Sequence, residues 1–142
     1  MHPKSTANLL KELLQTKQLN RYFASNEQEL LDTTLPQELN KLLALQPLSK
    51  GDIAVKSGLS RVYVYQIFSG QRIPSRDSLL RICFALSLEP EAICELLKHT
   101  GYPVLYPRDR RDSVILFAAS RHKTLLELEE MLDMQKLPGI QK

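Results

Sequence analysis

The sequence predicts an all-α protein, and three observations lead to that prediction. Apolar residues recur at spacings of three and four residues, which is the period of one face of an α-helix. Alternating runs of β-branched residues between Asn-Gly or Asp-Gly turns, which would indicate strands, do not occur. Serine, threonine or proline precedes several apolar segments and glycine follows some of them, as at the two ends of helices.

Helices are expected along most of the chain, each starting at a residue that suits a helix N-terminus. Serine and threonine do so because their side-chain oxygen accepts a hydrogen bond from the first turn, and proline because it fits the first helical position. In chain order, helices are expected after Ser5, around Leu19–Phe23, for a turn or two from Asn26, from Pro36 to before Pro47, from Ser49, from Ser60, after Ser75, from Glu89, from Arg108 and from Thr124.

The composition is that of an ordinary globular domain, with 142 residues of which 43% are hydrophobic and 25% charged. Two cysteines do not indicate a secreted disulfide framework. No apolar run approaches the roughly 18 residues of a membrane span, and the N-terminus lacks the apolar segment of a signal peptide. The expected location is therefore the cytoplasm.

No catalytic or metal-binding pattern is found in the sequence. The three histidines, His2, His99 and His122, are scattered without the spacing of a metal site. A phosphate-binding glycine loop and a Ser-His-Asp order are both lacking. We therefore expect no enzymatic activity, no metal and no cofactor.

Positive charge is concentrated in two blocks, although the whole chain carries only +3. Residues 49–82 hold six Lys/Arg and two Asp/Glu, which gives +4, and residues 101–123 hold five and two, which gives +3. Clustered basic residues are the electrostatic signature of a phosphate-bearing partner such as nucleic acid. Basic blocks are also often simply solvated, so the partner has to be inferred from a motif.

The most informative segment is Lys50–Gly70, which meets the requirements of two helices joined by a tight turn. Ala54 is small at the point where the second helix would cross the first. Gly58 stands where the turn needs a left-handed backbone, which costs glycine least. Val64 and Ile67, three residues apart, would face inward. This spacing predicts a helix-turn-helix.

The segment resembles the Cro/C1 repressor family, also called the xenobiotic-response-element family of lambda-repressor-like domains. The similarity covers roughly Leu39–Leu88. The family's small residue, turn glycine, capping serine, inward aliphatic residues, terminal glycine and following Pro-Ser are matched by Ala54, Gly58, Ser60, Val64, Ile67, Gly70 and Pro74-Ser75. The wider sequence is similar to an uncharacterised bacterial subfamily of helix-turn-helix proteins. The resemblance implies a lambda-repressor-like domain with helical N- and C-terminal extensions.

The resemblance also implies a sequence-specific transcriptional regulator whose second helix, residues 60–69, enters the major groove of double-stranded DNA. Arg61 would suit guanine, Gln66 adenine and Val62 a thymine methyl group. The implied base-contacting residues are Arg61, Val62, Tyr65 and Gln66. The implied phosphate-contacting residues, which set register rather than sequence choice, are Ser49, Lys50, Ser60, Tyr63, Ser69, Arg72 and Arg76.

The second helix is unusually aromatic for one that reads bases, and Phe68 is expected to lie in the core instead. The alternative function is a protein-interaction adaptor on the same fold, which binds a partner protein instead of, or as well as, DNA. Its contact surface would consist of Tyr63, Tyr65 and the charged cluster Arg108–Asp112. DNA would be favoured by one shared exposed surface for Lys50, Arg61, Gln66 and Arg72.

Amphipathic extensions flank the motif, so the expected domains are residues 1–35, 36–100 and 101–142. The middle one is the DNA-binding domain. The C-terminal extension would pack on the core of that domain or form a dimer seam, since repressors of this class bind two-fold sites as homodimers.

Three smaller expectations concern residues 101–142. Arg108, Arg110 and Arg111 form either a secondary basic edge or the first turn of a helix with paired or solvated side chains. Tyr102 and Tyr106 are expected to pack against the core. The tail from Leu137, which contains proline and glycine, is expected to fray.

Overall fold

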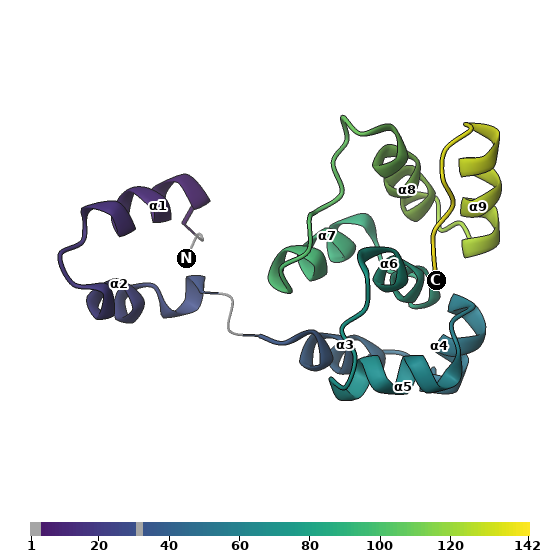
Figure 1. The fold of residues 1–142 in the computed structure, drawn as a ribbon, viewed down its shortest axis with the longest axis horizontal. Coiled ribbons are helices and arrows are strands. Elements are labelled where there is room, and N and C mark those ends of the chain that lie inside the picture. Colours follow the sequence, from purple (N-terminus) through teal and green to yellow (C-terminus); the bar gives the residue numbers. More distant parts are fainter. Residues whose placement is uncertain (1–3, 31–32) are drawn as a thin grey trace. The chain divides into compact units, whose positions relative to one another are not determined.

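The computed structural model describes residues 4–30 and 33–142, and every regular element within them is a helix (Figure 1). The all-α prediction is therefore confirmed. The elements are α1 (Thr6–Gln15), α2 (Leu19–Ser25), a 3₁₀ turn (Glu27–Glu29), α3 (Leu35–Ala44), α4 (Lys50–Ser57), α5 (Arg61–Ser69), α6 (Arg76–Ala85), α7 (Pro90–His99), α8 (Arg110–Ser120) and α9 (Leu125–Met134). None of these helices is long and apolar enough to cross a membrane.

The expected helix caps are confirmed. The Ser49 hydroxyl oxygen accepts a hydrogen bond from the Asp52 N–H at 3.1 Å, and the Ser60 oxygen accepts one from the Tyr63 N–H at 3.1 Å. Each bond satisfies an N–H group that has no partner within its own helix. The same arrangement is found at Ser5, Ser75 and Thr124, which cap α1, α6 and α9.

The chain divides into two compact units, Met1–Asp32 and Thr33–Lys142. In the N-terminal unit, α1 has no buried residue and α2 buries only Tyr22. In the C-terminal unit, by contrast, one hydrophobic core includes side chains from all seven helices and from the segment after α9.

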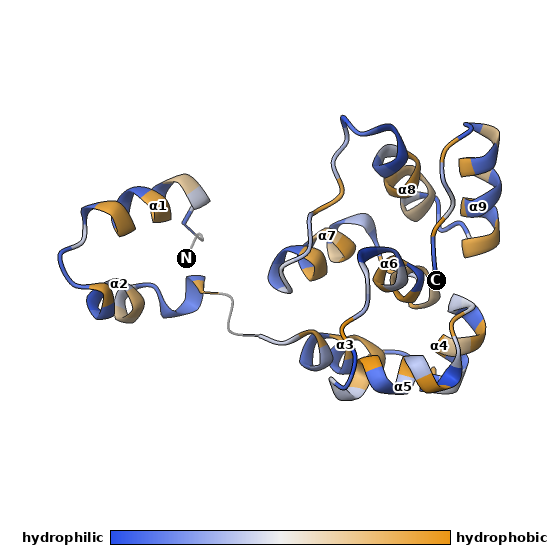
Figure 2. Cartoon of the chain, viewed as in Figure 1, coloured by the Kyte–Doolittle hydropathy of each residue, from blue (hydrophilic) through white to orange (hydrophobic). Residues whose placement is uncertain are grey.

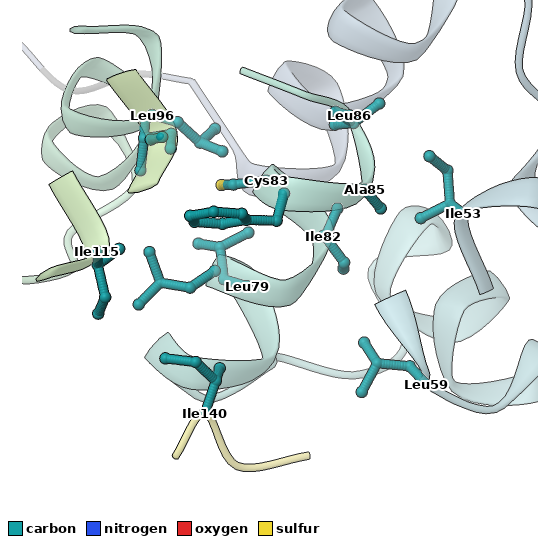
Figure 3. Close-up of a cluster of buried hydrophobic side chains, with 14 of the residues drawn as sticks. Ile53, Leu59, Leu79, Ile82, Cys83, Ala85, Leu86, Leu96, Ile115 and Ile140 are labelled. Atoms are coloured by element: carbon teal, nitrogen blue, oxygen red, sulfur yellow. The ribbon is translucent and has the colours of Figure 1, made fainter. Parts of the chain in front are cut away.

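Helix α6 lies at the centre of this core (Figure 3). Leu79, Ile82 and Cys83 are fully buried, between side chains of the helix-turn-helix on one side and of α7 and α8 on the other. Burial raises the pKa of the Cys83 thiol to about 12, so the thiol stays protonated and is a packing group rather than a nucleophile.

Helices α8 and α9 place their apolar faces in the same core as the helix-turn-helix. Ile115 of α8 and Leu128 and Leu132 of α9 are fully buried there. Phe117 is half exposed instead, with the guanidinium of Arg121 over its ring at 5.0 Å. Most of the apolar surface that could have formed a dimer seam is therefore used within one chain.

The expected fraying of the tail from Leu137 is wrong. Ile140 is 2% exposed and belongs to the core, and Figure 3 shows its side chain reaching toward α6 from the terminal segment. The Gln141 N–H donates to the Asp77 carboxylate at 2.9 Å, and Arg111 donates to the Gly139 carbonyl at 2.7 Å. A Pro-Gly pair is typical of a loose end, but the buried Ile140 side chain and hydrogen bonds to charged side chains hold this one.

Buried Arg81 joins the tail to the helix-turn-helix. Its Nη2 donates to the Ile140 carbonyl at 2.6 Å, and its Nη1 donates to the Ser57 carbonyl at 2.9 Å. The carboxylate of Glu129 lies 3.6 Å from Nη2. A buried arginine with these partners is satisfied both in charge and in hydrogen bonding.

Candidate nucleic-acid interface

The turn between α4 and α5 has the backbone that the sequence predicts. Gly58, which ends α4, has a φ of 72° in the left-handed region that side chains disfavour, and Gly70, which ends α5, has a φ of 87°. A Cβ on Gly58 would also lie 3.1 Å from the Arg81 guanidinium. Buried Ser57 accepts from the Leu59 N–H at 3.2 Å and donates to the Ala54 carbonyl at 3.3 Å. The turn is therefore tied to itself and to α6.

Helix α5 divides into an inward and an outward face. Val64, Ile67 and Phe68 are buried, which confirms that Phe68 belongs to the core. Tyr63 is partly buried and packs against the same core. Its ring therefore serves packing, while its neighbours Arg61, Val62 and Tyr65 remain exposed.

The outward residues of α5 meet the start of α4 in one open hollow. Val62 is 67% exposed and Tyr65 is 43% exposed at this surface. The hollow is lined by Lys50, Arg61, Val62, Tyr65, Gln66, Ser69 and Gln71. Two cations, two amides, a hydroxyl and an exposed aliphatic side chain thus face the same space, which is the mixture of groups that base edges and phosphates require.

Tyr65 organises the two cations of this hollow. The Lys50 ammonium lies 5.5 Å from the centre of its ring, and the Arg61 guanidinium carbon lies 5.8 Å from the same centre. Lys50 is also 5.8 Å from the Phe68 ring. Cations are attracted to aromatic faces at such distances, so the aromatic character of α5 holds positive charge at the surface of the hollow.

The remaining residues implied for phosphate contact are distributed around this hollow in different ways. Ser49 and Ser60 are exposed as the N-caps of α4 and α5, where the helix dipole favours an anion. Ser69 is exposed and donates to the Gln66 carbonyl at 3.1 Å. Arg72 is exposed just beyond α5 but does not line the hollow.

Arg76 is used differently from what the resemblance implied. Its guanidinium donates to both oxygens of Asp112, at 3.1 and 2.9 Å, and to the carbonyls of Pro103 and Val104. Its charge is thus neutralised within the protein by a bidentate carboxylate pair. Arg76 is therefore bound within the protein and does not line the hollow.

The charged cluster Arg108–Asp112 also has largely internal roles. Asp109 caps α8 by accepting from the Asp112 N–H at 2.9 Å, and Asp112 is buried against Arg76. Arg111 pairs with Asp77 at 2.9 Å. Of the three arginines of the possible basic edge, Arg108 and Arg110 remain exposed.

The nearby tyrosines differ from each other. Tyr102 is partly buried, packs against the core and donates its hydroxyl hydrogen to the Pro74 carbonyl at 2.6 Å, as expected of a packing residue. Tyr106 is 56% exposed, so the expectation that it packs against the core is wrong. Its backbone N–H is what the fold uses, since it donates to Asp112 at 2.9 Å.

Sequence reasoning missed two residues that matter to this surface. Gln71 lines the hollow from the turn after α5, where no periodic pattern extends. Arg81 supports the turn between α4 and α5 from below. Its position inside the run Leu79–Cys83 was a usable signal, because a cation among buried aliphatic residues needs partners inside the fold.

Comparison with known families identifies the segment that forms this surface. Residues 39–93 match a family model described as "Helix-turn-helix". The matched family is the Cro/C1-type helix-turn-helix family. The matched residues run from α3 into α7 and include the turn and α5, and their all-helical structure is that of a lambda-repressor-like fold. Searches of curated proteins and of solved structures found no match.

Among the residues that the structure describes, no group of three or more His, Cys, Asp or Glu side chains is placed to hold a metal ion. The family that residues 39–93 match is one of DNA-binding domains.

Proposed function

We infer that this chain is a sequence-specific DNA-binding regulator of transcription, acting in the cytoplasm as a homodimer on two-fold DNA sites. In this proposal α5 enters the major groove, with Arg61, Val62, Tyr65 and Gln66 at the bases. Ser49, Lys50, Ser60, Ser69 and Arg72 contact phosphates beside it, and the partly buried Tyr63 contributes at most its exposed edge.

One observation carries the proposal: Lys50, Arg61 and Gln66 line a single open hollow at the outward face of α5. An arginine and a glutamine on one helix face can each form two hydrogen bonds to a purine, whereas the neighbouring lysine can neutralise a phosphate. The match to the helix-turn-helix family and the +4 block of residues 49–82 support the same partner.

The adaptor function has less support. The adaptor hypothesis requires the cluster Arg108–Asp112 as part of its contact surface, but Asp112 and Arg111 form ion pairs within the chain. Tyr65 is exposed, yet two cations lie over its ring, which suits a polyanionic partner better than an apolar one.

The proposal is tested by selecting double-stranded oligonucleotides from a random pool at moderate salt and measuring binding to the enriched sequence. Replacing Arg61 with alanine should relax the preference at one base pair by about 1–3 kcal/mol. Replacing Lys50 with alanine should weaken binding to all sequences alike and reduce the salt slope by about one.

A matched control is Arg121→Ala, which removes an exposed arginine at the end of α8 whose cation lies over Phe117. This variant should bind the selected sequence as the parent does. A pool without an enriched sequence would overturn the proposal, as would an Arg121→Ala variant that loses as much affinity as Arg61→Ala.

A further inference from the structure

The N-terminal unit carries a set of large apolar side chains that are not buried within the unit. Its members are Leu10 at 55%, Leu13 at 36%, Leu14 at 75%, Leu19 at 54% and Phe23 at 43% exposure; we call them the hairpin face. Leu10 and Leu14 are four residues apart on α1, and Leu19 and Phe23 are four apart on α2. Each pair therefore lies on one side of its helix. Figure 2 shows these hydrophobic stretches along both helices.

The hairpin of α1 and α2 is closed by polar groups rather than by these leucines. The Lys4 ammonium donates to Glu12 at 3.0 Å and to Asn26 at 2.6 Å. The Asn26 side chain, which is 1% exposed, donates to Glu12 at 2.9 Å. These hydrogen bonds, that from Asn26 first, lower the pKa of Glu12. The network joins the two helices without using the side chains of the hairpin face.

A unit of this size needs a further source of stability. Chains below about 40 residues usually require a disulfide, a metal or association to fold stably, and this unit ends at Asp32. Its sequence contains no cysteine, since the two cysteines of the chain are Cys83 and Cys94. No metal-binding group is found among the described residues. Burial of the exposed apolar face against a further surface would supply that stability.

We propose that the hairpin face binds the hairpin face of a second copy of this chain, so that α1 and α2 of two protomers form a four-helix bundle. Residues 1–32 contain four Lys/Arg and four Asp/Glu, so two identical faces meet without net repulsion. A two-fold axis lets each leucine contact the same patch on the other protomer, and four amphipathic helices of this kind can enclose one apolar core.

The exposed large apolar side chains of α8 and α9 are Phe117, Leu126 and Met134, which are fewer than those of the hairpin face. The apolar faces of α8 and α9 are buried in their own core, with Ile115, Leu128 and Leu132 fully covered. The need for two copies rests on the proposed function, because one recognition helix reads too few bases and a two-fold DNA site needs two. The pairing itself requires no DNA.

The test is the mass of the full chain in solution without DNA, measured by sedimentation over a series of protein concentrations. The parent chain should form dimers. Leu14→Lys should weaken dimerisation on the order of 100-fold, because a two-fold interface loses the burial of two leucines at once. Leu126→Lys is the matched control, since Leu126 is 70% exposed on α9 and should leave the dimer unchanged.

Circular dichroism checks that the variants keep their helices, and Leu10→Lys provides a second variant on the same face should Leu14→Lys unfold. A parent chain that is monomeric at every concentration overturns the inference. Equal dimerisation of Leu14→Lys and the parent overturns it as well, and so does a loss caused by Leu126→Lys alone.

DNA binding separates this inference from the proposed function. If both hold, Leu14→Lys binds a single half-site as the parent does but loses the extra affinity for a two-fold site. A dimer that leaves every oligonucleotide unbound overturns the DNA-binding function and supports the hairpin pairing. A monomer that binds a selected sequence overturns the hairpin pairing and supports the DNA-binding function.

Discussion

The N-terminal hairpin and the C-terminal pair α8–α9 are both amphipathic extensions of the same helix-turn-helix, yet they are used in opposite ways. Helix α1 buries no residue, whereas α8 and α9 place Ile115, Leu128 and Leu132 in the domain core. An amphipathic helix therefore indicates that its apolar face will be covered, but it does not indicate which part of the protein, or which partner, covers that face.

The difference has a polar cause that lies on α6. Arg76 and Asp77 pair with Asp112 and Arg111 of α8, and Arg81 binds the terminal segment. These groups attach the C-terminal extension at defined points beside the core. In the N-terminal unit the polar network of Lys4, Glu12 and Asn26 closes the hairpin upon itself, so its apolar face stays available.

The largest effect is expected from removing the attachment at Arg81. Arg81→Met removes the donor that the carbonyls of Ser57 and Ile140 share with the carboxylate of Glu129. Loss of a buried arginine that donates to two buried carbonyls costs about 3–5 kcal/mol, so the free energy of unfolding in urea should fall by that amount. Arg21→Met, at an exposed arginine of α2, should leave the free energy of unfolding nearly unchanged. A similar loss of stability in the two variants would contradict the role of Arg81 as an attachment point.

A smaller effect is expected at Ile140, which tests the apolar side of the attachment. Ile140→Ala should cost about 2–5 kcal/mol because it opens a cavity in a packed core. Leu14→Ala, on the hairpin face, should change the free energy of unfolding of the C-terminal unit by less than about 0.5 kcal/mol. Hydrogen exchange of the α6 amides, at a concentration where the chain is monomeric, measures this free energy in both variants. Equal protection in the two variants would mean that the tail is not part of the core.

The smallest effect is expected on the dependence of stability on pH, through the carboxylate of Asp77. Burial raises the pKa of Asp77, but hydrogen bonds from Arg111 and the Gln141 N–H, with the positive charges nearby, lower it by more. A lowered pKa in the folded state stabilises the protein above the pKa of the unfolded chain, about 3.9. This stabilisation is lost as the pH falls through the lower folded value. Unfolding measured against pH should therefore be less acid-dependent in Asp77→Asn than in the parent, and identical curves would refute this role.

Much of the fold follows from local chemistry. Ser49, Ser60 and Thr124 cap their helices, and Gly58 and Gly70 adopt the left-handed backbone, as the sequence predicts. Phe68 is also correctly assigned to the core, because residues three and four apart share one face of a helix. Such features depend on contacts within a few residues, so a single sequence contains them.

What the sequence by itself determined is thus the set of helices, the turn between α4 and α5 and the inward face of α5. Only the tertiary structure decided which cations are available to a partner. Arg61, Arg76 and Arg111 are equally basic in the sequence, but Arg76 and Arg111 meet carboxylates 36 and 34 residues away. Arg61 instead lies over Tyr65 at an open surface. The physical reason is that charge pairing depends on distance in space, which chain position does not provide until the helices have packed.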